Sequence, residues 1–219
     1  MVINVHAGHN PTGMVACGAV GLIDESTENR KVKDEVIRQL IELGHTVYDC
    51  TVNDGIGQTD VLKKIVEKSN AHKAELDISI HFNSAANDMN GNGKTTGTEG
   101  FIYSASSKAK VYAEKVCQEI AGLGFKNRGV KYSASLYVLR NTKAPAMLIE
   151  CCFVDDRDDV ALYDWKSMAT AIVRGIAGRN PEEKGRLYRV QAGAYTVKAN
   201  AEALQEKLKN AGFDAMIVS

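Results

Sequence analysis

Short runs rich in apolar residues alternate along the chain with segments whose apolar residues recur every three or four positions. Such runs predict buried strands, and they cover residues 2–5, 46–50, 76–82, 101–103, 136–139 and 147–151. Helical spacing predicts four helices, which contain residues 32–41, 61–66, 112–120 and 168–176. Gly44 and Gly178 are expected to end the first and the fourth helix.

The alternation of strands and helices predicts an α/β fold, with a twisted mixed or parallel sheet and helices on both faces. Residues 87–97 contain two Asn-Gly pairs and little apolar periodicity, so we expect a loop there.

A change in composition predicts a second, smaller unit at the C-terminus. We expect the first domain to cover residues 1–178 and a polar linker containing Pro181 to cover 179–185. Residues 186–219 then predict a small β-α-β unit, with strands at 187–192 and 213–218 around a helix at 199–210.

Charge and cysteine usage exclude several classes of protein. The chain of 219 residues balances 27 basic against 27 acidic side chains, which argues against a nucleic-acid binder. No apolar run approaches the roughly 18 residues of a membrane span, and the N-terminus does not resemble a signal peptide. The five cysteines form no CxxC pair, so we expect free thiols in a protein made in the reducing cytoplasm.

Four side chains capable of metal chemistry stand where predicted strands and helices meet loops. His9 follows the first strand, Glu25 precedes the first helix, and His81 and Glu150 end two later strands. Hydrolytic zinc sites commonly combine two histidines and a carboxylate with a bound water, and a further carboxylate acts as general base. His9, Glu25 and His81 could supply the ligands and Glu150 the base, although Glu28 competes with Glu25 and the spacing is unlike HExxH.

The motifs around these residues resemble a known family. They are Ala-Gly-His9, Glu25-Ser-Thr-Glu-Asn29, Ser-Ile-His81-Phe-Asn and Pro-Ala-Met-Leu-Ile-Glu150-Cys-Cys-Phe. In this order, over about residues 2–175, they resemble the zinc-dependent N-acetylmuramoyl-L-alanine amidases of type 3. The resemblance implies one Zn²⁺ ion per chain, held by His9, Glu25 and His81, with Glu150 as the catalytic carboxylate. Glu25 is preferred to Glu28 because the family's ligand stands four residues before an Asn.

The implied reaction is hydrolysis of the amide between N-acetylmuramic acid and L-alanine in bacterial peptidoglycan. Arg140 and Asn83 are candidate neighbours of the substrate or the site, with a surface arginine and a loop-capping asparagine as the alternatives. The chain departs from the family at His6, often Asp, which makes His6 a rival ligand. It also departs at Asn10 and Asp156, and at Cys152, where Gly is frequent.

The C-terminal unit resembles the first half of a sporulation-related repeat (SPOR) domain. The resembling segments run over residues 187–195, 198–208 and 211–218. That family implies binding to peptidoglycan glycan strands. A half-length unit cannot bury much core, so we expect it to be poorly ordered, to dock on the first domain, or to pair between chains, and the oligomeric state stays open.

Three other functions remain open at this point. A cysteine hydrolase would use Cys151 or Cys152 as nucleophile and His81 as base. A zinc peptidase would cut within the stem peptide of peptidoglycan, and a wall-binding module would carry a vestigial metal site.

As an amidase the protein would act on the wall after release by lysis, by a holin or by a mother-cell route. Autolysins, phage lysins and sporulation lysis enzymes all fit, and the tail favours the last.

Overall fold

The protein is represented by a computed structural model that describes residues 1–179, 181 and 191–217. The chain divides into two units, Met1–Lys184 and Gly185–Ser219. Within the described residues, no helix is long and apolar enough to cross a membrane.

A six-stranded mixed sheet forms the centre of the first unit, in the order β2-β1-β3-β6-β4-β5. Its strands are β1 (Val2–Ala7), β2 (Thr46–Asp49), β3 (Leu76–Asn83), β4 (Thr98–Ile102), β5 (Asn127–Tyr132) and β6 (Ala146–Phe153). Neighbouring strands are parallel except for the antiparallel pair β4 and β6.

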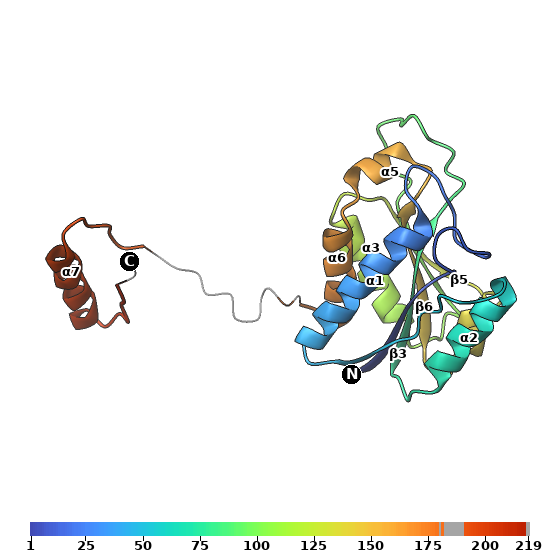
Figure 1. Ribbon diagram of the computed structural model, residues 1–219, viewed down its shortest axis with the longest axis horizontal. Coiled ribbons are helices and arrows are strands. Elements are labelled where there is room, and N and C mark those ends of the chain that lie inside the picture. The colour runs from blue at the N-terminus through green and yellow to red at the C-terminus, as the bar shows by residue number, and fades with distance from the viewer. Residues whose placement is uncertain (180, 182–190, 218–219) are drawn as a thin grey trace. The chain divides into compact units, whose positions relative to one another are not determined.

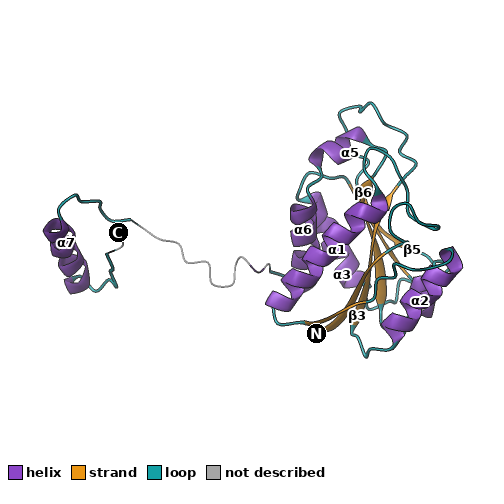
Figure 2. Ribbon diagram, viewed as in Figure 1, coloured by secondary structure: helices purple, strands orange, loops and turns teal. Residues whose placement is uncertain are grey.

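Helices cover both faces of this sheet, as Figures 1 and 2 show. One layer contains α1 (Glu25–Glu42), α3 (Lys110–Ala121) and α6 (Trp165–Ala177), and α2 (Gln58–Asn70) lies on the other side with α4 (Tyr137–Asn141). The short α5 (Arg157–Leu162) follows β6. The predicted α/β class, with a mixed sheet and helices on both faces, is confirmed.

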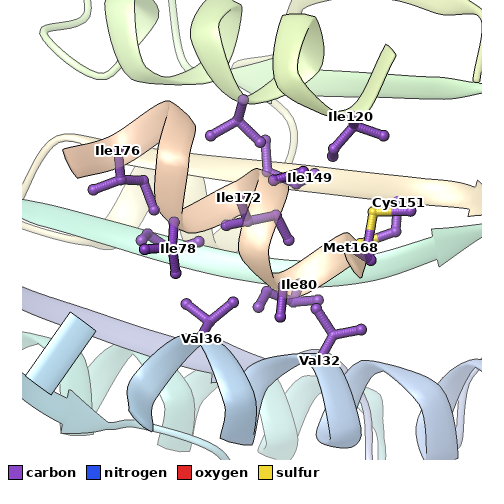
Figure 3. Close-up of a cluster of buried hydrophobic side chains, with 14 of the residues drawn as sticks. Val32, Val36, Ile78, Ile80, Ile120, Ile149, Cys151, Met168, Ile172 and Ile176 are labelled. Carbon is purple, nitrogen blue, oxygen red and sulfur yellow. The ribbon is translucent and has the colours of Figure 1, made fainter. Parts of the chain in front are cut away.

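The main core lies between the sheet and the α1–α3–α6 layer. Ile78 and Ile80 of β3 and Ile149 of β6 pack there against Val36 of α1 and Ile172 of α6, and all five are fully buried (Figure 3). Because strand side chains alternate between faces, the residues between these isoleucines point to the opposite side of the sheet.

That opposite face carries several buried polar residues. Asn4 and His6 of β1 pair in register with Asp77 and Ser79 of β3, and all four are buried. Their side chains bond to one another and to the carbonyl of Ser69 in α2. The same face continues toward the carboxyl ends of the strands, where the candidate site lies.

Two predicted elements differ from the structure in type or extent. Residues 136–139 were expected to be a strand, but Tyr137–Asn141 form α4. A run of four residues is too short for the spacing of apolar positions to distinguish a strand from a helical turn. In the structure, Val138 and Leu139 are buried in two different hydrophobic clusters. The first helix begins at Glu25, well before the apolar spacing that starts at Val32, because Asp24 accepts a hydrogen bond from the Thr27 amide.

Other differences concern polar segments. Strand β5 and helix α5 were not predicted, since Asn127–Tyr132 and Arg157–Leu162 are rich in charged residues. Strands β3 and β6 extend beyond His81 and Glu150, so these residues lie within the strands and not at their ends. As expected, residues 87–97 contain neither helix nor strand.

In the C-terminal unit the predicted helix is confirmed as α7 (Lys198–Asn210). The expected flanking strands are not formed at residues 191–192 and 213–217, and residues 187–190 and 218 lie outside the described part. No residue of α7 is buried, so these segments lack the packed face that stabilises a strand.

Gly175 allows α6 to approach α3 closely. A Cβ atom there would lie 2.6 Å from Val116 Cα, so we expect Gly175→Ala to lower the free energy of unfolding by about 1–3 kcal/mol. This loss would outweigh the helix propensity of about 1 kcal/mol that alanine normally adds. Denaturant unfolding measures the change, and Gly57→Ala is the control, because nothing lies within 4 Å of a Cβ at that position. A Gly175→Ala protein as stable as the parent would contradict the prediction.

Candidate active site

The Glu25 carboxylate lies at the centre of the candidate site. Its Oε1 atom is 3.0 Å from His81 Nδ1 and 3.4 Å from His9 Nε2. The same oxygen accepts a hydrogen bond from the Phe82 amide at 3.1 Å, and Oε2 accepts one from the Ala19 amide at 2.8 Å. Burial alone would raise the pKa of Glu25, but the hydrogen bonds to the two histidines outweigh it and hold the pKa far below its usual range.

Helix α1 fixes the loop that carries His9. Residue 9 adopts a left-handed conformation with φ of 62°, which is uncommon for a residue with a side chain. Asn29 Nδ2 donates to the Gly8 carbonyl at 3.0 Å, and Arg30 Nη2 donates to the His9 carbonyl at 2.9 Å. Because Asn29 follows Glu25 by one helical turn, the same face of α1 supplies the carboxylate and fastens the loop.

Two glycines leave room for the candidate ligands. A Cβ atom at Gly8 would lie 2.0 Å from the His81 ring, and one at Gly18 would lie 2.4 Å from the Glu25 carboxylate. Any larger residue at either position would displace a side chain of the site. The His9 and His81 rings pack edge to face, with their centroids 5.0 Å apart.

Glu150 lies beside this group on the neighbouring strand. It pairs in register with His81 of β3 and with Glu99 of β4, so all three side chains share one face of the sheet. Glu150 Oε2 is buried and has no hydrogen-bond partner among the described residues. Burial and the nearby charges of Glu25 and Glu99 raise the pKa of Glu150 to about 8, and Lys131 opposes this effect.

Glu99 is a buried carboxylate with cationic partners on β5. Arg128 Nε and Lys131 Nζ each lie 2.6 Å from Glu99 Oε2. Burial alone would raise the pKa of Glu99, but the hydrogen bonds from Arg128 and Lys131 lower it by more, so the net shift is downward. Asn83, a predicted neighbour of the site, donates from Nδ2 to Glu99 Oε1 at 3.0 Å.

The structure separates the two rival ligands from the group. His6 Nε2 lies 3.2 Å from Asp77 Oδ1, in the buried polar row. Glu28 accepts hydrogen bonds from Tyr163 Oη at 3.0 Å and from Lys31 Nζ at 2.7 Å.

Arg140, another predicted neighbour, is exposed on α4. Within the described residues, its guanidinium is seen 6.0 Å from the Tyr137 ring centroid, and no contact joins it to His9, Glu25, His81 or Glu150.

The cysteine-nucleophile alternative finds no support in the geometry. Cys151 and Cys152 are completely buried, and burial raises the pKa of both thiols well above the ordinary value. Because the thiolate is the nucleophile, both are inert apolar fillers. All five cysteines are free, as predicted.

Comparison with known proteins decides the family. Residues 3–179 match the N-acetylmuramoyl-L-alanine amidase family, and residues 168–219 match the SPOR domain. The chain belongs to the N-acetylmuramoyl-L-alanine amidase family. The amidase match covers the sheet except for Val2, and it includes every residue of the candidate site. The SPOR match begins within α6, upstream of the unit expected at 186–219.

Individual relatives agree with this assignment. The amidase CwlM of Bacillus licheniformis is 31% identical, over 74% of this chain and 63% of its own length. An uncharacterized protein of Clostridium perfringens is 41% identical over 74% of this chain. The chain spans about half the length of the Clostridium perfringens relatives it matches. Among solved structures, the catalytic domain of the CD27L endolysin targeting Clostridium difficile matches with a TM-score of 0.72 and 26% identity, over 82% of this chain and 98% of that domain.

The residues of the candidate site fit a metal ion of the zinc type. Ligand atoms of His9, Glu25 and His81 all lie within 4.8 Å of one another. The 3.0 and 3.4 Å separations are close to the roughly 3.3 Å expected between donors about 2 Å from a tetrahedral ion. Two histidines and one carboxylate, with glycine cradles behind them, are the donor set of a hydrolytic zinc site.

Sequence reasoning missed several residues that shape this site. Gly18 lies in a loop without apolar periodicity, and its role depends on where the Glu25 side chain lies. Glu99, Arg128 and Lys131 belong to strands whose first residues are polar, and the antiparallel pairing of β4 with β6 brings them close. Among these positions, the only local signal was a carboxylate between two glycines, in Gly-Thr-Glu99-Gly.

The raised pKa of Glu150 predicts a pH-dependent stability in the metal-free protein. Between the ordinary value of 4.5 and about 8, the folded protein keeps a proton that the unfolded chain has lost. Raising the pH through this window therefore destabilises the parent protein relative to Glu150→Gln, by up to about 1.4 kcal/mol per pH unit. Chemical denaturation from pH 5 to 8 measures the difference, with the exposed Glu67→Gln as control. A difference that does not change with pH would contradict the assignment.

Proposed function

We propose that this chain hydrolyses the amide bond between N-acetylmuramic acid and L-alanine in bacterial peptidoglycan, with one Zn²⁺ ion per chain. The observation that carries the proposal is the approach of His9, Glu25, His81 and Glu150 within a domain of the amidase family. The match of residues 168–219 to the SPOR domain supports a second contact with the wall, through the glycan strand.

His9, Glu25 and His81 would hold the ion. If zinc were bound there, its charge would lower the pKa of a water molecule and would polarise the scissile carbonyl. The amides of Phe82 and Ala19 fix both oxygens of Glu25, so the carboxylate keeps its orientation without help from solvent. Such supporting bonds commonly change metal affinity by ten- to a hundredfold when they are lost.

Glu150 would move the proton. Its Oε2 atom is buried and unpartnered, so it is free to accept the proton of the attacking water and to return it to the leaving nitrogen of L-alanine. Glu99 is held by Arg128 and Lys131. Because these ion pairs lower the pKa of Glu99, its carboxylate does not compete with Glu150 for that proton.

Replacing Glu150 tests its role. We expect Glu150→Gln to lower kcat by about 10²- to 10⁴-fold, because the amide cannot accept a proton. Zinc affinity, measured by competition with a chromophoric chelator, should stay within a few-fold of the parent value. Glu28→Gln is the matched control, since Glu28 bonds to Tyr163 away from the site. A Glu150→Gln protein that lyses walls at the parent rate would refute the catalytic assignment.

Metal removal and product analysis test the reaction itself. Treatment with EDTA should abolish cleavage of purified muropeptides, and added Zn²⁺ should restore it. Mass spectrometry should then show free muramic acid carboxyl groups and peptides that begin with L-alanine. Cleavage within the stem peptide would indicate a peptidase, and intact muropeptides in the presence of zinc would indicate a binding module with a vestigial site.

A further inference from the structure

A cationic cleft opens beside the site, and the reaction described above does not use it. The cavity has a volume of about 340 Å³ and is lined by Asn92, Lys94, Thr95, Thr96, Lys126 and Arg128. Three of these six side chains are cationic and none is acidic. We call it the β5 cleft, because Lys126 precedes β5 and Arg128 belongs to it.

The cations of the β5 cleft are only partly neutralised. Lys94 and Lys126 are exposed, and neither side chain has an acidic partner among the described residues. Arg128 bonds to Glu99, but Lys131 bonds to the same carboxylate oxygen, so one negative charge serves two cations. An anionic ligand would therefore gain more here than on a surface of paired charges.

The walls of the cleft are held in place before any ligand arrives. Asp158 Oδ2 accepts hydrogen bonds from the amides of Asn92 and Gly93 at 2.8 Å and from the Lys94 amide at 3.2 Å. Asp156 accepts one from the Thr96 amide at 3.1 Å. These two carboxylates are thus occupied by backbone donors.

The second wall is fastened to the first and to β6. The Lys126 amide donates to Thr95 Oγ1 at 3.1 Å. The Arg128 guanidinium lies 5.1 Å from the Phe153 ring centroid, above the end of β6. A binding site whose walls are already ordered costs little conformational entropy when it is filled.

Contacts through Glu99 connect the cleft to the candidate catalytic carboxylate. Arg128 lines the cleft and bonds to Glu99, and Glu99 is the register partner of Glu150 on the adjacent strand. A substrate whose scissile amide lies at Glu150 would therefore have β5 on one side of it. Of the two parts of the substrate, the glycan is uncharged once its lactyl carboxyl is in the amide, whereas the stem peptide carries free carboxylates.

We propose that the β5 cleft binds a carboxylate of the stem peptide, with Lys94, Lys126 and Arg128 as its specificity-determining cations. This inference rests on the proposed amidase function. It assigns the peptide side of the scissile bond to β5 and makes the amidation state of the stem peptide a determinant of cleavage.

The test compares two synthetic muramoyl peptides, one with free stem-peptide carboxylates and one with every carboxylate converted to the amide. For the parent protein we expect the free-acid substrate to have the higher kcat/KM. In the Lys94→Gln/Lys126→Gln double variant, the ratio of the two kcat/KM values should fall by about three- to tenfold, mainly through KM, as expected for the loss of two ion pairs made by exposed lysines. Binding of the free stem peptide alone, measured by calorimetry, should weaken in parallel.

Two controls separate charge recognition from damage to the fold. Lys126→Arg keeps the charge and should preserve the ratio. Lys73→Gln/Lys115→Gln removes two exposed lysines that do not line the cleft and should also preserve it. Equal losses on both substrates, or an unchanged ratio, would overturn the inference. If the parent protein cleaves neither substrate between muramic acid and alanine, the proposed amidase function is refuted, and this inference is refuted with it.

Discussion

The parallel pairing of β3 and β6 is the constraint on which the rest of the structure depends. Its register places Ile78 opposite Met147 and Ile80 opposite Ile149, and these residues are fully buried. The same register places His81 opposite Glu150 on the other face. Because side chains alternate along a strand, a shift by one residue would bury the two polar side chains in the core and break the site. Packing of the core thus also sets the position of the chemistry.

The two site carboxylates show how this frame assigns different roles to the same chemical group. Burial alone would raise the pKa of Glu25, but the hydrogen bonds to His81 and His9 outweigh burial and lower it. Two backbone amides hold its carboxylate in place. The Oε2 atom of Glu150 is buried without such partners, and burial together with the charges of Glu25 and Glu99 raises the pKa of Glu150 to about 8. Active sites often contain two neighbouring titratable groups whose environments push their pKa values apart. The group with the lowered pKa then acts as a fixed charge or a metal ligand, and the other exchanges protons. The geometry therefore favours Glu25 as ligand and Glu150 as base.

Local patterns predicted most of the elements, and their limits have physical causes. Helices α1, α2, α3 and α6 have apolar faces at helical spacing, and their existence followed from the sequence. The α4 turn could not be predicted because it is too short to show a periodic pattern. Strand β5 could not be predicted because most of its residues are polar. Proximity of His9, Glu25 and His81 could be expected from their places beside strands and from the family motifs. The position of Glu99 could not, since it depends on which strand pairs with β6.

Strand β4 shows why that non-local pairing matters for the chemistry. It is the one strand that runs antiparallel to its β6 neighbour, and this direction places Glu99 beside Glu150 while Gly100 faces the core. Two carboxylates on adjacent strands repel each other unless a cation intervenes. Arg128 and Lys131 of β5 form ion pairs with Glu99, whereas Glu150 feels only the weaker, more distant charge of Lys131. The outer strand thereby keeps one carboxylate ionised, leaves the other free to take up a proton, and presents its remaining positive charge to the β5 cleft.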